Sequence, residues 1–188
     1  PCDVSSLQSL REVSGLHGFN LDFCHRFLSH IGRGGLTGIL GRSLGRHDDV
    51  VDADGANLRK LVKGREPSFS PDGRKVVFTS SAFHDNDEIY YIDLDGSNRV
   101  RLTDNLRKFD WFAAWSPNGD RLAYNSEAFG GQELMVMRAD GKAQTRITIA
   151  EKTYEQEPAW SPDGKALAYA GKMGDDDYDI YIVGTSGF

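Results

Sequence analysis

The chain has 188 residues, enough to bury a sizeable core, and its 39% hydrophobic and 27% charged content is typical of a folded globular protein. No apolar stretch approaches the roughly 20 residues that a membrane-spanning helix needs, so no membrane span is predicted. The net charge of -6 is concentrated in residues 49–188, which hold 17 Lys/Arg against 24 Asp/Glu. This acidic balance disfavours a sequence-independent grip on nucleic-acid phosphates, which Lys and Arg would supply.

Residues 1–48 form an N-terminal segment that differs from the rest of the chain. It contains both cysteines, Cys2 and Cys24, and four of the five histidines, but the spacing matches no closed set of four metal ligands. Whether the two cysteines form a disulfide stays an open question. We expect two short helices, one around Leu7 and Leu10 and a second starting at Asn20. Residues 32–46, with six glycines, match neither a helix nor a strand.

The remainder of the chain repeats. The tetrapeptide Ser-Pro-Asp/Asn-Gly occurs at residues 70–73, 116–119 and 161–164, with spacings of 46 and 45 residues. Proline presets φ for a turn, Asp or Asn tolerates the next position, and glycine takes the positive φ that a hairpin needs. A second marker, Asp-Gly or Ser-Gly, recurs at residues 54–55, 95–96, 140–141 and 186–187. A fixed period of this length predicts a repeat architecture.

Each repeat is predicted to contain four short strands. An aromatic residue ends the first, an aliphatic-small-aromatic strand follows the turn, the third is an almost continuous apolar run, and the fourth pairs a basic with an aliphatic residue. We expect the third strands, residues 88–92, 133–137 and 179–183, to be buried on both faces. Four antiparallel strands in about 45 residues make one blade of a β-propeller, so the predicted fold is all-β.

The same columns carry a resemblance to a known family. A first strand ending in aromatic-Ser-Pro-Asp-Gly, an acidic residue before the third strand, Asp-Gly, and a basic-Leu-Thr fourth strand together resemble the TolB-type (WD-repeat-like) β-propeller repeat over residues 50–188. The resemblance implies a propeller scaffold whose partners are cell-envelope proteins. It also implies a periplasmic or otherwise extracytoplasmic location in a bacterium. Many unrelated proteins use this blade, so the resemblance is specific for the fold but not for the function.

The repeats account for about three blades, whereas closed propellers have about four to eight. Counting back from Asp54, the apolar pattern of the third strand is lost at Asp48 and Asp49. The repeat is therefore expected to begin in mid-strand, and the predicted propeller domain is residues 49–188. At the other end the third strand is the last one predicted. Three interpretations stay open: a piece of a longer propeller, which we favour; residues 1–48 replacing missing strands; or a homo-oligomer in which chains share one ring.

No residues are predicted to be catalytic, and no metal site or cofactor is predicted. The chain has no Gly-x-Ser-x-Gly elbow, zinc-protease motif, phosphate-binding loop or dinucleotide fingerprint, and His84 has no positioned nucleophile beside it. The acidic loops at residues 85–88 and 175–179 offer oxygen ligands for calcium but lack the EF-hand spacing. Glu88 and Asp179 fit better as an acidic column of the repeat, and the calcium question stays open.

Two loops combine aromatic and charged residues, at 106–111 and 151–155. Because rigid sheets position such loops and aromatic residues anchor interfaces, we predict that Phe109, Asp110, Trp111 and Tyr154 bind a protein partner. The alternative is that Phe109 and Trp111 only cover the end of the core.

The predicted function is a non-catalytic scaffold for protein–protein interaction. The alternative is the gating propeller of a peptidase resembling the prolyl oligopeptidases, whose catalytic domain is not among these residues. Carbohydrate binding is a third hypothesis, with only three tryptophans to support it.

Overall fold

The computed structural model describes residues 37–41, 48–52, 59–83, 85–105, 108–148, 153–173 and 177–187. The two helices expected near the N-terminus, both cysteines, His84, Asp175 and Asp176 lie outside these residues. The described part contains strands and turns only, arranged as four antiparallel sheets. The predicted all-β architecture of propeller blades is therefore confirmed.

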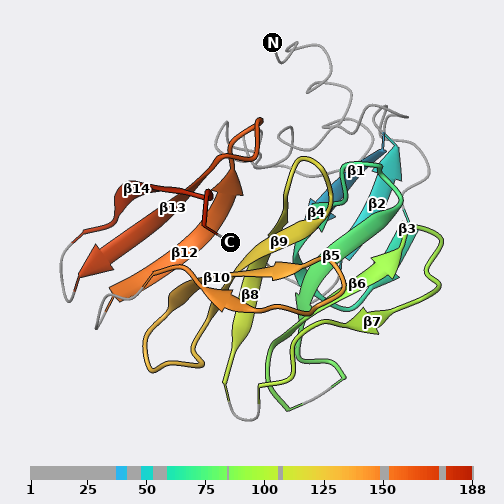
Figure 1. Cartoon of the computed structure of the whole chain (residues 1–188). Helices are drawn as coiled ribbons and strands as arrows, with labels where there is room; N and C mark the ends of the chain where they lie inside the picture. The colour runs from blue at the N-terminus through green and yellow to red at the C-terminus, as the bar shows by residue number, and fades with distance from the viewer. Residues whose placement is uncertain are drawn as a thin grey trace.

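Strands follow one another in space in their chain order within each sheet (Figure 1). The first sheet is β1 (Thr37–Gly41), β2 (Asp48–Asp52) and β3 (Arg59–Val62). The second is β4 (Arg65–Phe69), β5 (Lys75–Ser80), β6 (Glu88–Asp93) and β7 (Val100–Arg101). The third is β8 (Asp110–Trp115), β9 (Arg121–Ser126), β10 (Glu133–Arg138) and β11 (Thr145–Arg146). The last is β12 (Thr153–Trp160), β13 (Ala166–Met173) and β14 (Asp179–Gly184).

The first sheet contains β-structure upstream of the predicted domain of residues 49–188. The sequence predicted a start in mid-strand, yet β1 lies inside the glycine-spaced stretch and pairs with β2 from Thr37–Asp52 to Gly41–Asp48. Asp48 and Asp49, where the apolar column fails, are paired with both β1 and β3. Backbone hydrogen bonds to a neighbouring strand do not depend on side-chain polarity, which is why the hydrophobic pattern missed this strand.

The Ser-Pro-Asp/Asn-Gly turns have the predicted conformation. Gly73, Gly119 and Gly164 have φ between 70° and 76°. In the first turn the Ser70 hydroxyl donates to Asp72 Oδ1 (2.6 Å) and accepts from the Lys75 amide (2.9 Å). The bond from Ser70 lowers the pKa of Asp72 below its ordinary value. The serine therefore closes the hairpin and sets the register of the strand that follows.

A β-bulge recurs in the first strand of the second, third and fourth sheets. Glu66, Phe112 and Glu157 have φ between 55° and 57°, an uncommon conformation for residues other than glycine. Each lies at a register shift with the next strand. Glu66 Oε2 accepts from the Phe112 amide of the neighbouring sheet (3.1 Å) and from the Thr79 hydroxyl (2.9 Å). This carboxylate links the bulges of two adjacent blades.

The core lies between successive sheets. Phe69, Val76 and Phe78 pack toward Leu61 and Val62 of β3. The opposite face of the second sheet packs on the third sheet, and the other face of the third sheet packs on the fourth. Each contact is a cluster of buried, mainly apolar side chains. The residues that make these two interfaces are Val77, Ile89, Leu122, Tyr124, Met135 and Met137 in one, and Ala123, Leu134, Val136 and Leu167 in the other.

The last sheet departs from the prediction that third strands are buried on both faces. Ile89 and Leu134 are fully buried, whereas Ile180 and Ile182 of β14 are 74% and 76% exposed. The prediction was wrong for residues 179–183, because no sheet among the described residues packs against that side of β14. A two-sided apolar run shows what a strand is suited to pack against, not whether a partner is present.

Candidate interaction surface

Phe109 and Trp111, two of the predicted partner-binding residues, lie at the start of β8. Phe109 is 41% exposed, Trp111 is half-buried, and their ring centroids are 6.1 Å apart in a tilted arrangement. The exposed ring therefore rests on a partly buried one. An aromatic side chain supported in this way loses little conformational freedom when it enters an interface.

Asp110, between these two aromatic residues, is fully buried. Its amide donates to the carbonyl oxygen of Asp87 (3.0 Å), and its carboxylate accepts from Asn105 Nδ2. Burial raises the pKa of Asp110 to about 6, and hydrogen bonds from Ser126 and Thr103 lower it against that effect. The Asp110 carboxylate therefore lies inside the interface between the second and third sheets.

Tyr154 lies at the start of β12 and is 43% exposed. The ammonium group of Lys172, its partner across the strands, is 5.4 Å from the Tyr154 ring centroid and 5.3 Å from that of Tyr178. Tyr178 precedes β14 and is also exposed. One cation therefore holds two exposed aromatic rings together.

The loop between β9 and β10 joins these two groups. The Glu127 amide donates to the Phe109 carbonyl oxygen, and the Glu155 amide donates to the Gln132 carbonyl oxygen, both at 3.0 Å. At the tip of this loop Phe129 is 55% exposed, with the Arg146 guanidinium 5.0 Å from its ring centroid. Because antiparallel strands alternate in direction, the start of β8, this loop and the start of β12 share one end of the blades.

We call Phe109, Phe129, Tyr154 and Tyr178 the aromatic rim. Sequence reasoning found Phe109 and Tyr154 and missed the other two. The missed pair had a signal, because each lies between the second and third strands of its repeat, at the same end of the blade as the loops that were selected. The local mixture of charges in a loop does not reveal this shared position.

Two buried acids are paired with arginines in successive blades. Glu88 accepts from Arg101 (2.9 Å) and from the Thr103 hydroxyl (2.6 Å). At the equivalent position of the next blade, Glu133 accepts from Arg146 (3.1 Å), whose Nε donates to the Thr148 carbonyl oxygen (2.8 Å). These bonds fix the guanidinium that contacts Phe129. Glu88 was predicted to belong to an acidic column of the repeat, and its hydrogen bonds lie within its own blade.

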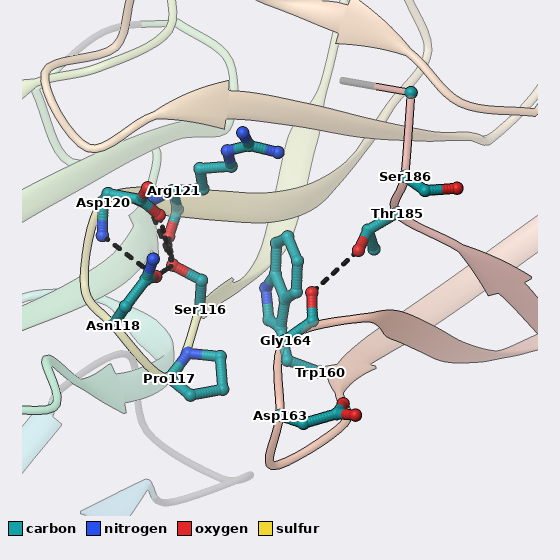
Figure 2. Close-up of a pocket in the computed structure, with 11 residues that line it drawn as sticks. Ser116, Pro117, Asn118, Asp120, Arg121, Trp160, Asp163, Gly164, Thr185 and Ser186 are labelled. Carbon is teal, nitrogen blue, oxygen red and sulfur yellow. Dashed lines mark hydrogen bonds between the residues drawn. The ribbon is translucent and has the colours of Figure 1, made fainter.

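A pocket of about 410 Å³ lies at the other end of the blades (Figure 2). Its walls are the turns at residues 116–121 and 160–164 and the last turn, residues 185–187. The polar groups are largely occupied by the turns themselves: Ser116 donates to Asn118 (2.8 Å), and the Thr185 hydroxyl donates to the Gly164 carbonyl oxygen (2.7 Å). Trp160 Nε1 donates to the Ala114 carbonyl oxygen (3.1 Å). The Ser116 hydroxyl also lies 3.2 Å from Asp120 Oδ1, within the same turn.

The described residues contain no group of three or more His, Cys, Asp and Glu side chains placed to hold a metal ion. They also contain no helix long and apolar enough to cross a membrane.

Known proteins share the sequence pattern and the fold. The Tol-Pal system protein TolB of Thioalkalivibrio sulfidiphilus is 42% identical over 57 residues, which are 28% of this chain and 13% of that protein. A structure from Agrobacterium tumefaciens described as a TolB covers 84% of this chain and 60% of its own, with a TM-score of 0.73 and 20% identity. The puromycin-hydrolyzing peptidase of Mycobacterium tuberculosis has a TM-score of 0.60 and 16% identity, over 80% of this chain and 27% of its own.

The chain spans less than two thirds of the length of these relatives. The structural likenesses, at or below 20% identity, concern the fold alone. The model of the TolB beta propeller domain matches residues 62–187, which is more than half of the chain. These residues comprise the second, third and fourth sheets, and the chain therefore belongs to the TolB beta propeller domain family.

Proposed function

We propose that this chain is a non-catalytic propeller scaffold that binds a protein partner through the aromatic rim. The observation that carries the proposal is the gathering of four exposed aromatic side chains at one end of rigid blades, connected by hydrogen bonds and cation–π contacts. Aromatic side chains that are held in position are typical anchors of protein interfaces. The buried Glu133 holds Arg146, whose guanidinium supports one of them, Phe129.

The class of partner follows from the relatives. A protein 42% identical over its matched part is named as a component of the Tol-Pal system, and we propose that this chain binds an envelope component of the same kind, outside the cytoplasm. Asp110 contributes by holding the start of β8 from inside, whereas Phe109 and Tyr154 make the contact.

The test measures binding of the purified Pal component of the Thioalkalivibrio sulfidiphilus Tol-Pal system to the immobilised chain. We expect Phe109→Ala combined with Phe129→Ala to weaken binding by at least about tenfold, because two anchors are lost. The matched control is Val100→Ala, which trims an exposed apolar residue on β7, outside the rim. Circular dichroism confirms folding of each variant.

Three outcomes would count against the proposal. Full binding by the double variant would remove the rim as the contact surface. No binding by the unaltered chain would remove this partner. Release of product from peptide or puromycin substrates by the purified chain would contradict the non-catalytic role.

The peptidase propeller is the second candidate function. The fold likeness to the puromycin-hydrolyzing peptidase covers 80% of this chain and motivates this candidate. The discriminating observation is the gene from which the chain derives. A Gly-x-Ser-x-Gly motif followed by Asp and His in the same reading frame would make the peptidase the preferred function.

A further inference from the structure

Two carboxyl groups lie buried together where the second sheet meets the third. Glu88 of β6 and Asp110 of β8 are both fully buried, and we call them the acid pair. The Thr103 hydroxyl lies between them, because it donates to Glu88 Oε2 (2.6 Å) and is also within hydrogen-bonding reach of the Asp110 carboxyl group. A hydroxyl has one proton and can donate it to only one acid. The two acids therefore compete for a single donor.

The positive charge at the acid pair belongs to Glu88. Arg101 donates to Glu88 Oε1 (2.9 Å), and the same guanidinium forms a second ion pair with Asp104 (2.7 Å). The side chains that bond to the Asp110 carboxyl group are neutral: Asn105, Ser126 and Thr103. A second buried negative charge at this place costs more free energy than a buried neutral acid.

Ionisable side chains on the other strands packed against β8 do not change this balance. Tyr124 of β9 is neutral, because burial, together with the charges of Asp110 and Glu88, raises the pKa of its phenol. The strand β5 ends here in uncharged side chains, Thr79 and Ser80. The remaining groups at this end of the blades are Arg65 and Glu66 of β4, which pair with each other while Arg65 also pairs with Asp87, and Glu155 of β12, which belongs to the next junction.

The same set of groups occurs where the third sheet meets the fourth. Glu133 and Glu155 are both buried, and the Thr148 hydroxyl donates to Glu155. Arg146 donates to Glu133 (3.1 Å), as Arg101 does to Glu88 at the first junction. Two acids, one threonine and one arginine thus recur at successive junctions, which indicates that the arrangement belongs to the repeat and not to a single loop.

We propose that Glu88 and Asp110 share one proton through Thr103, with Glu88 ionised and Asp110 neutral, and that loss of this proton to solvent loosens the start of β8. In the protonated state the Asp110 hydroxyl donates to Thr103 Oγ, and Thr103 donates to Glu88. The Thr103 oxygen has a second lone pair, which receives the Ile89 amide (2.9 Å). Once Asp110 is ionised, two carboxylates face one hydroxyl proton, so the acids titrate as a coupled pair.

The shared proton bears on how Phe109 is presented. The Asp110 amide donates to the Asp87 carbonyl oxygen (3.0 Å), and the Asp110 carboxyl group accepts from Asn105 Nδ2 (2.5 Å). The Asn105 carbonyl oxygen in turn accepts from the Lys108 amide (3.2 Å). Asp110 therefore connects the residues on either side of Phe109 to the second sheet, and a charge that weakens its seat weakens the support of the aromatic rim.

Carbon-13 NMR of the full chain, labelled at the aspartate carboxyl carbons, tests the shared proton. One resonance, identified by its absence in Asp110→Asn, should titrate near pH 6, whereas exposed aspartates titrate near about pH 4. Glu88→Gln removes the neighbouring charge and should lower the Asp110 midpoint by at least about one pH unit. The matched control is Asp95→Asn, which removes an equal charge from an exposed turn and should leave the midpoint unchanged. Circular dichroism confirms folding of each variant.

Hydrogen exchange of the amide at position 110 reports on the start of β8 without any partner. After correction for the intrinsic exchange rate, its protection should fall about tenfold between about pH 5 and about pH 7.5 in the wild type, and stay constant in Asp110→Asn. Binding of the purified Pal component should weaken over the same range in the wild type alone. Only this last measurement rests on the proposed function.

Each measurement has an outcome that would overturn part of the proposal. An Asp110 midpoint below about pH 5, or one unchanged by Glu88→Gln, would overturn the shared proton. A midpoint near pH 6 with constant exchange protection would overturn the effect on β8. If the chain binds no Pal while the titration and the exchange behave as expected, the proposed partner fails and the shared proton stands.

Discussion

Ile89 and Ile180 occupy the same column of the same strand in two blades, yet one is fully buried and the other is 74% exposed. Both strands are apolar, both pair with the second strand of their sheet, and both begin after an acidic loop. The difference lies only in what packs outside. In the second sheet the column meets β8–β11, and in the last sheet it meets no described residue. The repeat therefore determines which face is ready to pack, and the neighbouring blade determines whether burial contributes stability.

The largest effect is expected from truncating this matched pair. Ile89→Ala should lower the free energy of unfolding by about 2–5 kcal/mol, because it leaves a cavity between two sheets. Ile180→Ala should change it by less than about 0.5 kcal/mol in the monomer. Urea unfolding at low protein concentration measures both. Equal losses would mean that the outer face of β14 is covered in solution.

A smaller effect is expected at Asp110, which lies in the closed interface and has a pKa raised to about 6 by burial. A carboxyl group whose pKa is higher in the folded than in the unfolded state binds its proton more tightly when folded. The contribution of Asp110 to the stability should therefore fall as the pH rises from about 4 through 6. Asp110→Asn should remove that part of the pH dependence and stabilise the chain at pH 7 by up to about 3 kcal/mol.

Unfolding at several pH values checks this prediction. The two chains should converge in stability below about pH 4, where the wild-type carboxyl is protonated in both states. A variant less stable than the wild type at pH 7 would show that the charged carboxylate, with its bond from Asn105, is favourable in place.

The smallest effect concerns two glycines in equivalent turns, Gly96 and Gly141, with φ of 90° and 81°. A Cβ at Gly141 would lie 2.9 Å from the carbonyl oxygen of Leu102 in the preceding blade, whereas a Cβ at Gly96 would meet nothing within 4 Å. Gly96→Ala should cost about 1–2 kcal/mol from backbone strain alone. Gly141→Ala should cost more, because the blades must also move apart.

Thermal unfolding of the two variants side by side measures the excess. Equal melting temperatures would contradict a tight contact between the turn of one blade and the next. The difference thus reports the packing between blades separately from the strain within a turn.

Much of the fold was predictable from particular residues. The Ser-Pro-Asp/Asn-Gly turns and the apolar third strands located the strands from residue 59 onward, because a hairpin is determined by the φ preferences of its own few residues. Within the candidate site, Phe109 and Tyr154 are exposed, whereas Asp110 is buried. The gathering of Phe129 and Tyr178 beside them was not visible, since it arises when three hairpins meet at one end of the blades. Whether these residues bind a partner stays a prediction.

The sequence by itself determined the strands, the turns and the two apolar faces of each blade, because these depend on side-chain periodicity and on local backbone preferences. Only the tertiary structure decided that β1 pairs with two aspartates in β2, that Asp110 is buried with a raised pKa, and that Ile180 is exposed. The reason is physical: burial, and the electrostatic shift that comes with it, depends on atoms brought from other blades, which no window of the chain contains.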